Sequence, residues 1–315
     1  MKNSTPQYAF NKTELQLLRE LAKGKQSLLQ IKRLLQIKSA ILSRNLKKLQ
    51  QKGIIQTTAE GNRKNAYFSE TKHASLLRDL LLSNDFMDWE NILSGKSIEI
   101  LFQTLDDESD LSSFSGATLW RYLKELKARG IITETQKGYR INPRFSILAD
   151  FLKEYERYFV NKIAKTLSEN SVILWQKDME FIVRGPKSTE APSGDFHKTA
   201  TTIFAQFGLP LFSEFDIYFY STKKKTISPE DSILHTLLIE PKNVRYTTYA
   251  LLLLRKVHKQ VDLTYLQKES ERYGLKNQID AMLQFLETHI RPEGQSLPSW
   301  NEFVLKAKDY GVRVE

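Results

Sequence analysis

AILSRNLKKLQQKGII, residues 40–55, recurs in the same chain as a diverged copy, ATLWRYLKELKARGII, at residues 117–132. The two align without gaps at a constant offset of 77, and nine of sixteen positions are identical. Self-similarity at a fixed offset indicates one supersecondary unit built twice. In each copy an amphipathic helix is predicted to end at a glycine, Gly53 or Gly130, and a hydrophobic strand to follow. The identical pairs are Ala40/Ala117, Leu42/Leu119, Arg44/Arg121, Leu46/Leu123, Lys47/Lys124, Leu49/Leu126, Gly53/Gly130, Ile54/Ile131 and Ile55/Ile132.

Three short helices are predicted around the first copy. A capped start at Asn11 and a stop at Gly24 bound the first helix, and residues 26–34 give the second. Ser39 is the expected N-cap of the third helix, residues 40–51. The buried stripe of this third helix is expected to contain Ile41 or Leu42, then Leu46 and Leu49.

A basic helix face and a basic hairpin are expected next to each other in this module. Strands at residues 54–57 and 66–69 would be joined by a turn at residues 59–65, which carries Arg63 and Lys64 at its tip. The exposed face of the third helix would present Ser43, Arg44, Lys47 and Lys48.

The positive charge of the chain is concentrated in this first module. Residues 1–65 hold fourteen Lys and Arg against three acids, a net charge of +11 (14 − 3). The whole chain has a net charge of +10, so the remaining residues are close to neutral. A charge run is usually a solvated helix face, but a surplus of this size over one small module favours a polyanionic partner. Neutralising phosphates releases counterions, and this release drives nucleic-acid binding.

SRNLKKLQQKGII followed by GNRKNAYFS resembles the winged helix-turn-helix domain of ArsR-like and MarR-like transcription regulators. The resemblance covers residues 10–72. It implies that Ser39, Ser43, Arg44 and Lys47 approach the major groove of DNA. It also implies that the wing residues Arg63 and Lys64 contact the DNA backbone or the minor groove. A module that binds only protein is the alternative.

The second module, residues 96–145, is predicted to repeat this arrangement. Ser115 would cap its third helix, and a short helix is expected at residues 111–114. Residues 96–145 hold eight basic and seven acidic side chains, so the electrostatic contribution to DNA binding is weak. A second DNA-binding half and a scaffold or dimerisation module therefore both stay open. The candidate DNA contacts are Thr118, Arg121, Lys124, Lys127 and, in the wing, Lys137.

We expect an α+β chain that is mostly helical, with two winged helix-turn-helix domains followed by a C-terminal α+β domain. The predicted boundaries are 1–72 for the first domain, 73–95 for a connecting helix, 96–145 for the second domain, 146–170 for a linker or dimerisation helix, and 171–315 for the last domain. That domain is predicted to hold strands at 171–174, 181–184 and 215–220, and helices at 196–207, 229–239, 246–257, 263–273, 278–289 and 299–310.

Composition argues against several other classes of protein. The chain has no cysteine and its five histidines lack metal-ligand spacing, so no cofactor and no metal are expected. Asp195 and Asp216 are not part of a D-x-D pair, and no P-loop or nucleophile elbow occurs, so an enzyme is not expected. The longest apolar run, Ala250–Leu254, is too short for a membrane span. A cytoplasmic location is expected.

DSILHTLLIEPKNVRYTTYALLLLRK, residues 231–256, looks like C-terminal segments found with winged helices in archaeal regulators. It also looks like segments of the antitoxin half of abortive-infection type IV toxin–antitoxin systems. The resemblance implies a protein partner or a small effector at the C-terminal domain. The basic run Lys223–Lys225 is either an accessory phosphate contact or a solvated turn.

Two functions follow from these patterns. The first is a transcription regulator whose recognition helices bind double-stranded DNA in the major groove, with a C-terminal domain that senses a ligand or a partner. The alternative is an antitoxin-like interaction module that regulates its own expression through the winged helices. A homodimer is compatible with both.

Overall fold

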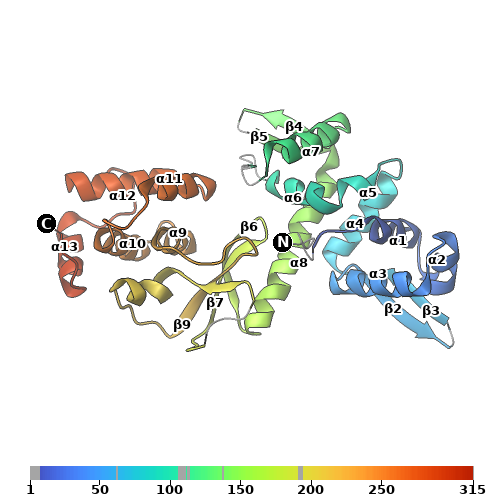
Figure 1. Ribbon diagram of the computed structural model, residues 1–315, viewed down its shortest axis with the longest axis horizontal. Coiled ribbons are helices and arrows are strands. Elements are labelled where there is room, and N and C mark those ends of the chain that lie inside the picture. The colour runs from blue at the N-terminus through green and yellow to red at the C-terminus, as the bar shows by residue number, and fades with distance from the viewer. Residues whose placement is uncertain are drawn as a thin grey trace. The chain divides into compact units, whose positions relative to one another are not determined.

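The computed structural model describes residues 8–61, 63–105, 111, 114–136, 138–190 and 194–314. The chain forms two compact units, Met1–Phe159 and Val160–Glu315, and the boundary falls within helix α8, Ser146–Leu167. Figure 1 labels most of the helices and strands of the two units. The described elements are mostly helices, with short sheets in each unit, which confirms the predicted α+β class. No helix among the described residues is long and apolar enough to cross a membrane.

The first module follows the predicted order, with two shifts in helix boundaries. Asn11 caps α1 in a capping box with Glu14, as its sequence predicts. Residues 26 and 27 do not start the second helix; they form a short strand on the hairpin, and Ser27 then caps α2. The elements are α1 Lys12–Ala22, β1 Gln26–Ser27, α2 Leu28–Leu34, α3 Ser39–Gln51, β2 Ile55–Glu60 and β3 Arg63–Phe68.

The wing is longer and its turn tighter than expected. Strands β2 and β3 pair from Ile55↔Phe68 to Glu60↔Arg63, so only residues 61–62 lie between them. The prediction of a seven-residue turn was wrong because Ala59 and Asn65, which are poor strand formers, pair within the ladder. Asn65 is held there by a 3.1 Å hydrogen bond to Glu60. Arg63 and Lys64 therefore lie on β3, directly after the turn.

The segment predicted as one connecting helix is two helices. Helix α4, Lys72–Ser83, ends at Asn84, and α5, Trp89–Ile92, begins after its cap Asp88. The indole of Trp89 is buried and donates a 2.9 Å hydrogen bond to the Asn84 carbonyl, which fixes the turn between the two helices.

The second module repeats the helix, glycine and hairpin order. Its elements are α6 Gly95–Gln103, α7 Gly116–Ala128, β4 Ile132–Thr135 and β5 Gly138–Ile141, followed by the 3-10 turn η1 Pro143–Phe145. Ser115 is the N-cap residue of α7, as predicted, but its side chain bonds Thr118 rather than the helix backbone. The short helix expected at residues 111–114 lies largely outside the described residues, and its two described ends are not helical.

Aromatic side chains of α8 contribute to the core of the first unit. The rings of Phe10 and Tyr155 stack at 5.5 Å, and Phe151 lies 5.3 Å from Tyr155. The Tyr155 hydroxyl donates a 2.9 Å hydrogen bond to the Tyr8 carbonyl. All three of these rings are almost fully buried. The N-terminal half of α8 is thus part of the first unit and not a free linker.

A four-stranded antiparallel sheet organises the second unit. Its strand order is β6-β7-β9-β8, from β6 Val172–Lys177, β7 Glu180–Pro186, β8 Phe196–Lys198 and β9 Phe215–Tyr220. The helix expected at residues 196–207 was wrong in its first part, because β8 pairs with β9, and residues Ala200–Phe207 form a 3-10 helix, η2. Alternate residues of β7 and β9 face two cores. Val160 and Ala164 of α8 cover one face, and the helices after the sheet pack on the other.

The C-terminal helices agree with their predicted positions to within two residues at each end. They pack around a buried core that includes Leu251, Leu253, Met282 and Phe285. Their bounds are α9 Pro229–Ile239, α10 Val244–Lys256, α11 Leu263–Arg272, α12 Lys276–Thr288 and α13 Trp300–Asp309.

Candidate nucleic-acid interface

Helix α3 buries one stripe and exposes the predicted DNA-contacting face. Leu42, Leu46 and Leu49 are buried, whereas Ile41 is 41% exposed, which settles the alternative left open by the sequence. Asn45 is also buried; its amide donates to the Ile41 carbonyl, and its carbonyl oxygen accepts a 3.0 Å hydrogen bond from Asn11. The buried leucines and the Asn11–Asn45 hydrogen bond together fix the rotation of α3 relative to α1.

The predicted contacts of the first module share one property: they are exposed and free of ion pairs. Within the described part of the chain, no ion pair involves any of the cations among them. Ser39 is the first residue of α3 rather than its cap, because Lys38 has the extended conformation of the cap position. The exposed residues are Ser39, Ser43, Arg44, Lys47 and Lys48 on α3, and Arg63 and Lys64 on β3.

A buried ion pair anchors the C-terminal end of α3, and the sequence did not reveal it. Lys52 Nζ lies 2.9 Å from Glu14 Oε2, and the two side chains are 5% and 1% exposed. Burial lowers the pKa of Lys52, while the Glu14 carboxylate acts in the opposite direction. The ammonium also lies 5.1 Å from the centre of the Phe10 ring. Lys52 counted towards the basic surplus of the sequence, but it is unavailable to a polyanion.

Gly53 lies where α3, the β2–β3 hairpin and α8 come into close contact. Its φ is +68°, a conformation that L side chains rarely adopt, and an added Cβ would lie 2.5 Å from the Tyr158 hydroxyl oxygen. Its carbonyl accepts hydrogen bonds from the hydroxyls of Ser69, at 2.5 Å, and Thr71, at 3.0 Å. The neighbouring Lys52 carbonyl lies 3.1 Å from Nε2 of buried His73. These contacts tie the recognition helix to the core of its own unit.

The second copy has the same backbone geometry. Gly130 also has a φ of +68°. The Ile131 amide bonds the Leu126 carbonyl at 2.9 Å, as Ile54 bonds Leu49 at 3.1 Å in the first copy. The strand returning from the wing makes a 2.8 Å hydrogen bond in both copies, from Ser69 to Ile54 and from Asn142 to Ile131. The internal repeat of the sequence thus coincides with a repeat of hydrogen bonds.

The cations of the α7 helix, in contrast, contact acids or aromatic rings of the same unit. Lys127 pairs with Glu134 at 2.6 Å, and Arg129 pairs with Glu125 at 2.8 Å and with Asp88 at 3.3 Å. Lys124 lies over the Trp120 ring and Arg121 over the Tyr122 ring, each 4.8 Å from the ring centre. Thr118 bonds the Ser115 hydroxyl. Lys137, the predicted wing contact, lies outside the described residues.

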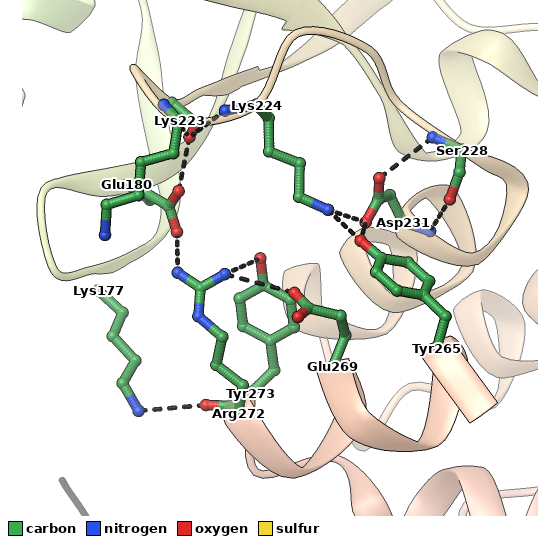
Figure 2. A network of polar contacts seen from close by, with 11 residues as sticks. Lys177, Glu180, Lys223, Lys224, Ser228, Asp231, Tyr265, Glu269, Arg272 and Tyr273 are labelled. Atoms are coloured by element: carbon green, nitrogen blue, oxygen red, sulfur yellow. Dashed lines mark hydrogen bonds and ion pairs between the residues drawn. The ribbon is translucent and has the colours of Figure 1, made fainter. Parts of the chain in front are cut away.

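Ion pairs in the second unit connect β7 with α11 and the loop after β9 with α9 (Figure 2). Arg272 pairs with Glu180, whose carboxylate accepts a 2.6 Å hydrogen bond from Ser221. Lys224 pairs with Asp231 and also contacts Tyr265. Because Lys224 is engaged in this network, the run Lys223–Lys225 is not the three-cation phosphate contact that the sequence suggested. Only Lys223 and Lys225 of the run are exposed.

Asp216, and His235 among the five histidines of the chain, have structural partners. Asp216 is 5% exposed and pairs with Lys198 at 2.7 Å. His235 is fully buried, its Nδ1 lies 2.7 Å from the Thr199 hydroxyl, and burial lowers the pKa of His235 to about 3. Over the described residues, no group of three or more His, Cys, Asp or Glu side chains is placed to hold a metal ion.

Comparison with known protein families gave two matches. Residues 10–91 match the model of the HxlR-like helix-turn-helix family, and residues 193–312 match the model described as HVO_2833_C, C-terminal. A search of curated proteins found no match. The first match supports a helix-turn-helix transcription regulator, and it runs through α4 and α5 as well as the winged module. Neither match names an antitoxin, so that resemblance stays a prediction.

Proposed function

We propose that the chain is a DNA-binding transcription regulator whose first module binds duplex DNA with α3 in the major groove and the β2–β3 wing against the backbone. The observation that carries the proposal is the set of exposed cations on α3 and β3 that no described acid neutralises, on a module of the helix-turn-helix type. Unpaired Lys and Arg release counterions from phosphates without first breaking an ion pair.

The second module contributes less to duplex binding in this proposal. Its recognition helix keeps Arg121 and Lys124 at the positions of Arg44 and Lys47, but Lys127 is paired with an acid. The C-terminal domain is proposed to bind an effector or a protein partner. Support comes from its separate compact core and from a family match that does not include the helix-turn-helix residues. A second copy of the chain is a further proposed partner.

Fluorescence anisotropy on mixed-sequence duplex DNA, measured across a salt series, tests the proposal. The expected result for the wild type is a steep linear fall of log affinity with log salt. Arg44→Ala/Lys47→Ala is expected to reduce this slope by about two, roughly one per phosphate contact removed. Arg121→Ala/Lys124→Ala is expected to reduce it by less.

A matched control separates the effect of lower net charge from the effect of removing cations at the proposed interface. Lys12→Ala/Lys153→Ala removes the same charge from exposed sites on α1 and α8, outside the proposed interface. This variant is expected to retain the wild-type slope. Absence of duplex binding by the wild type, or equal losses in the control and in Arg44→Ala/Lys47→Ala, would overturn the proposal.

A further inference from the structure

Helices α3 and α7 differ on their exposed faces at one position that bears on ligand binding. Ser43 of α3 corresponds to Trp120 of α7, whose side chain is 65% exposed. Tryptophan is highly buried on average, so a mostly exposed one on a helix face is a candidate contact for a planar or apolar ligand.

Cations and a second ring lie along the same stripe of α7. Residues 120, 124 and 127 are spaced by four and three, so their side chains share one helix face. Lys124 Nζ lies 4.8 Å from the centre of the Trp120 ring, and Lys127 Nζ lies 5.5 Å from that of Tyr139 on β5. Aromatic rings alternating with ammonium groups are the pattern that binds a nucleic-acid strand by stacking and by phosphate contact.

This surface is better suited to unpaired bases than to an intact duplex. Bases in a duplex present their edges in the major groove, and their faces are covered by neighbouring pairs. An indole ring therefore has no base face to stack on until a strand is unpaired. Two of the nearby cations, Lys127 and Arg129, are already paired with acids, which weakens attraction to the dense charge of duplex DNA. Stacking does not depend on that charge.

We infer that the Trp120–Lys124 face of α7, with Arg121 beside it, binds unpaired nucleobases of a DNA strand next to the duplex held by the first module. The inference rests on the proposed function for the neighbouring duplex, but the α7 surface itself needs only a single strand. A DNA strand fits this face better than a peptide does. It supplies ring faces for Trp120 together with phosphates for Arg121 and Lys124, whereas a neutral peptide lacks the charge and an acidic peptide lacks bases that stack on the indole.

The test compares a blunt duplex with the same duplex carrying a single-stranded dT extension. Binding is measured by anisotropy for the wild-type chain, Trp120→Ala, Trp120→Phe and Phe86→Ala. Phe86 is a matched control, since this aromatic residue is 79% exposed and lies between α4 and α5 rather than on α7. The measured quantity is the ratio of the two affinities, which cancels general effects on duplex binding.

The extension is expected to raise wild-type affinity roughly 5- to 150-fold per stacked base. Trp120→Ala is expected to bring the ratio close to one, Trp120→Phe to restore part of it, and Phe86→Ala to leave it unchanged. A wild-type ratio of one, or an equal ratio in Trp120→Ala, would overturn the inference. The dT strand alone separates the two proposals. If it binds through Trp120 while the duplex does not bind, the proposed function fails and the α7 site stands.

Discussion

The α3 copy presents cations without ion pairs to any described acid, and buried contacts anchor the end of its helix. In the α7 copy, acids and aromatic rings contact the cations, and no side chain of the described residues packs against the glycine at the helix end. Lys52 at the end of α3 is 4% exposed, whereas its counterpart Arg129 is partly exposed and forms two ion pairs. The backbone hydrogen bonds around Gly53 and Gly130 are nevertheless the same. The helix, glycine and hairpin element therefore keeps its fold through the backbone and the glycine, while the side chains at equivalent positions diverge in role.

Removal of the two counterpart cations is expected to give the largest difference between the copies. Lys52→Met leaves the Glu14 carboxylate buried without its ammonium, which costs about 3–5 kcal/mol. Arg129→Met breaks only partly exposed ion pairs and should cost about 1 kcal/mol or less. Hydrogen exchange of the α3 and α7 amides measures the free energy of local opening in each case.

The double variant Glu14→Gln/Lys52→Met checks the cause of that cost. With no buried charge left, it should be more stable than Lys52→Met alone. Equal costs for Lys52→Met and Arg129→Met would mean that the buried pair does not distinguish the two modules.

Substitution of the glycine at the end of each helix is expected to give the next largest difference in stability between the two copies. Gly130→Ala meets no atom within 4 Å and should cost only the left-handed backbone conformation, about 1–2 kcal/mol. Gly53→Ala has the same φ but must also displace Tyr158, so its free energy of unfolding should fall further than that of Gly130→Ala. Urea denaturation of the two variants makes the comparison.

Removing the Tyr158 ring tests the contact directly. Against a Tyr158→Ala background, the additional cost of Gly53→Ala should approach that of Gly130→Ala, because only the backbone conformation is then strained. Independent, additive costs of the two substitutions would show that Tyr158 does not constrain Gly53.

Local signals in the sequence were sufficient for most of the fold. The capping box at Asn11 placed the start of α1, and the repeated glycine placed the ends of α3 and α7. The β8 strand was missed because Phe196–Lys198 is short and its pairing with β9 is a contact distant in sequence. The helical periodicity of the residues after it dominated the prediction.

The candidate site was predicted only as a set of exposed residues, and its energetics were not. Arg44 and Lys47 follow from the helix period, so their exposure could be derived from the sequence. Lys52 looked like another surface cation, because nothing local indicates that Glu14, 38 residues earlier, would be its buried partner. Trp120 was visible in the repeat, but its meaning depends on the exposure and the Lys124 contact that the structure supplies.

The smallest expected difference between the copies concerns pH. Burial lowers the pKa of His73, whose ring centre lies 4.4 Å from that of Tyr158. In the second copy the equivalent position, five residues after the end of the strand that returns from the hairpin, is Ser146, which has no titratable group. The folded state therefore binds fewer protons than the unfolded state once the pH falls below about 6.5, so stability conferred by the neutral ring is lost as the pH decreases. Hydrogen exchange at α4, corrected for intrinsic rates, should show less acid destabilisation in His73→Gln than in the wild type. The α7 amides should respond to pH equally in both proteins, because no titrating group was changed near them.

An identical pH response at α4 in His73→Gln and the wild type would show that the first copy owes its acid sensitivity to another group. The contrast between the ends of α3 and α7 would then rest on Lys52 and Gly53 alone.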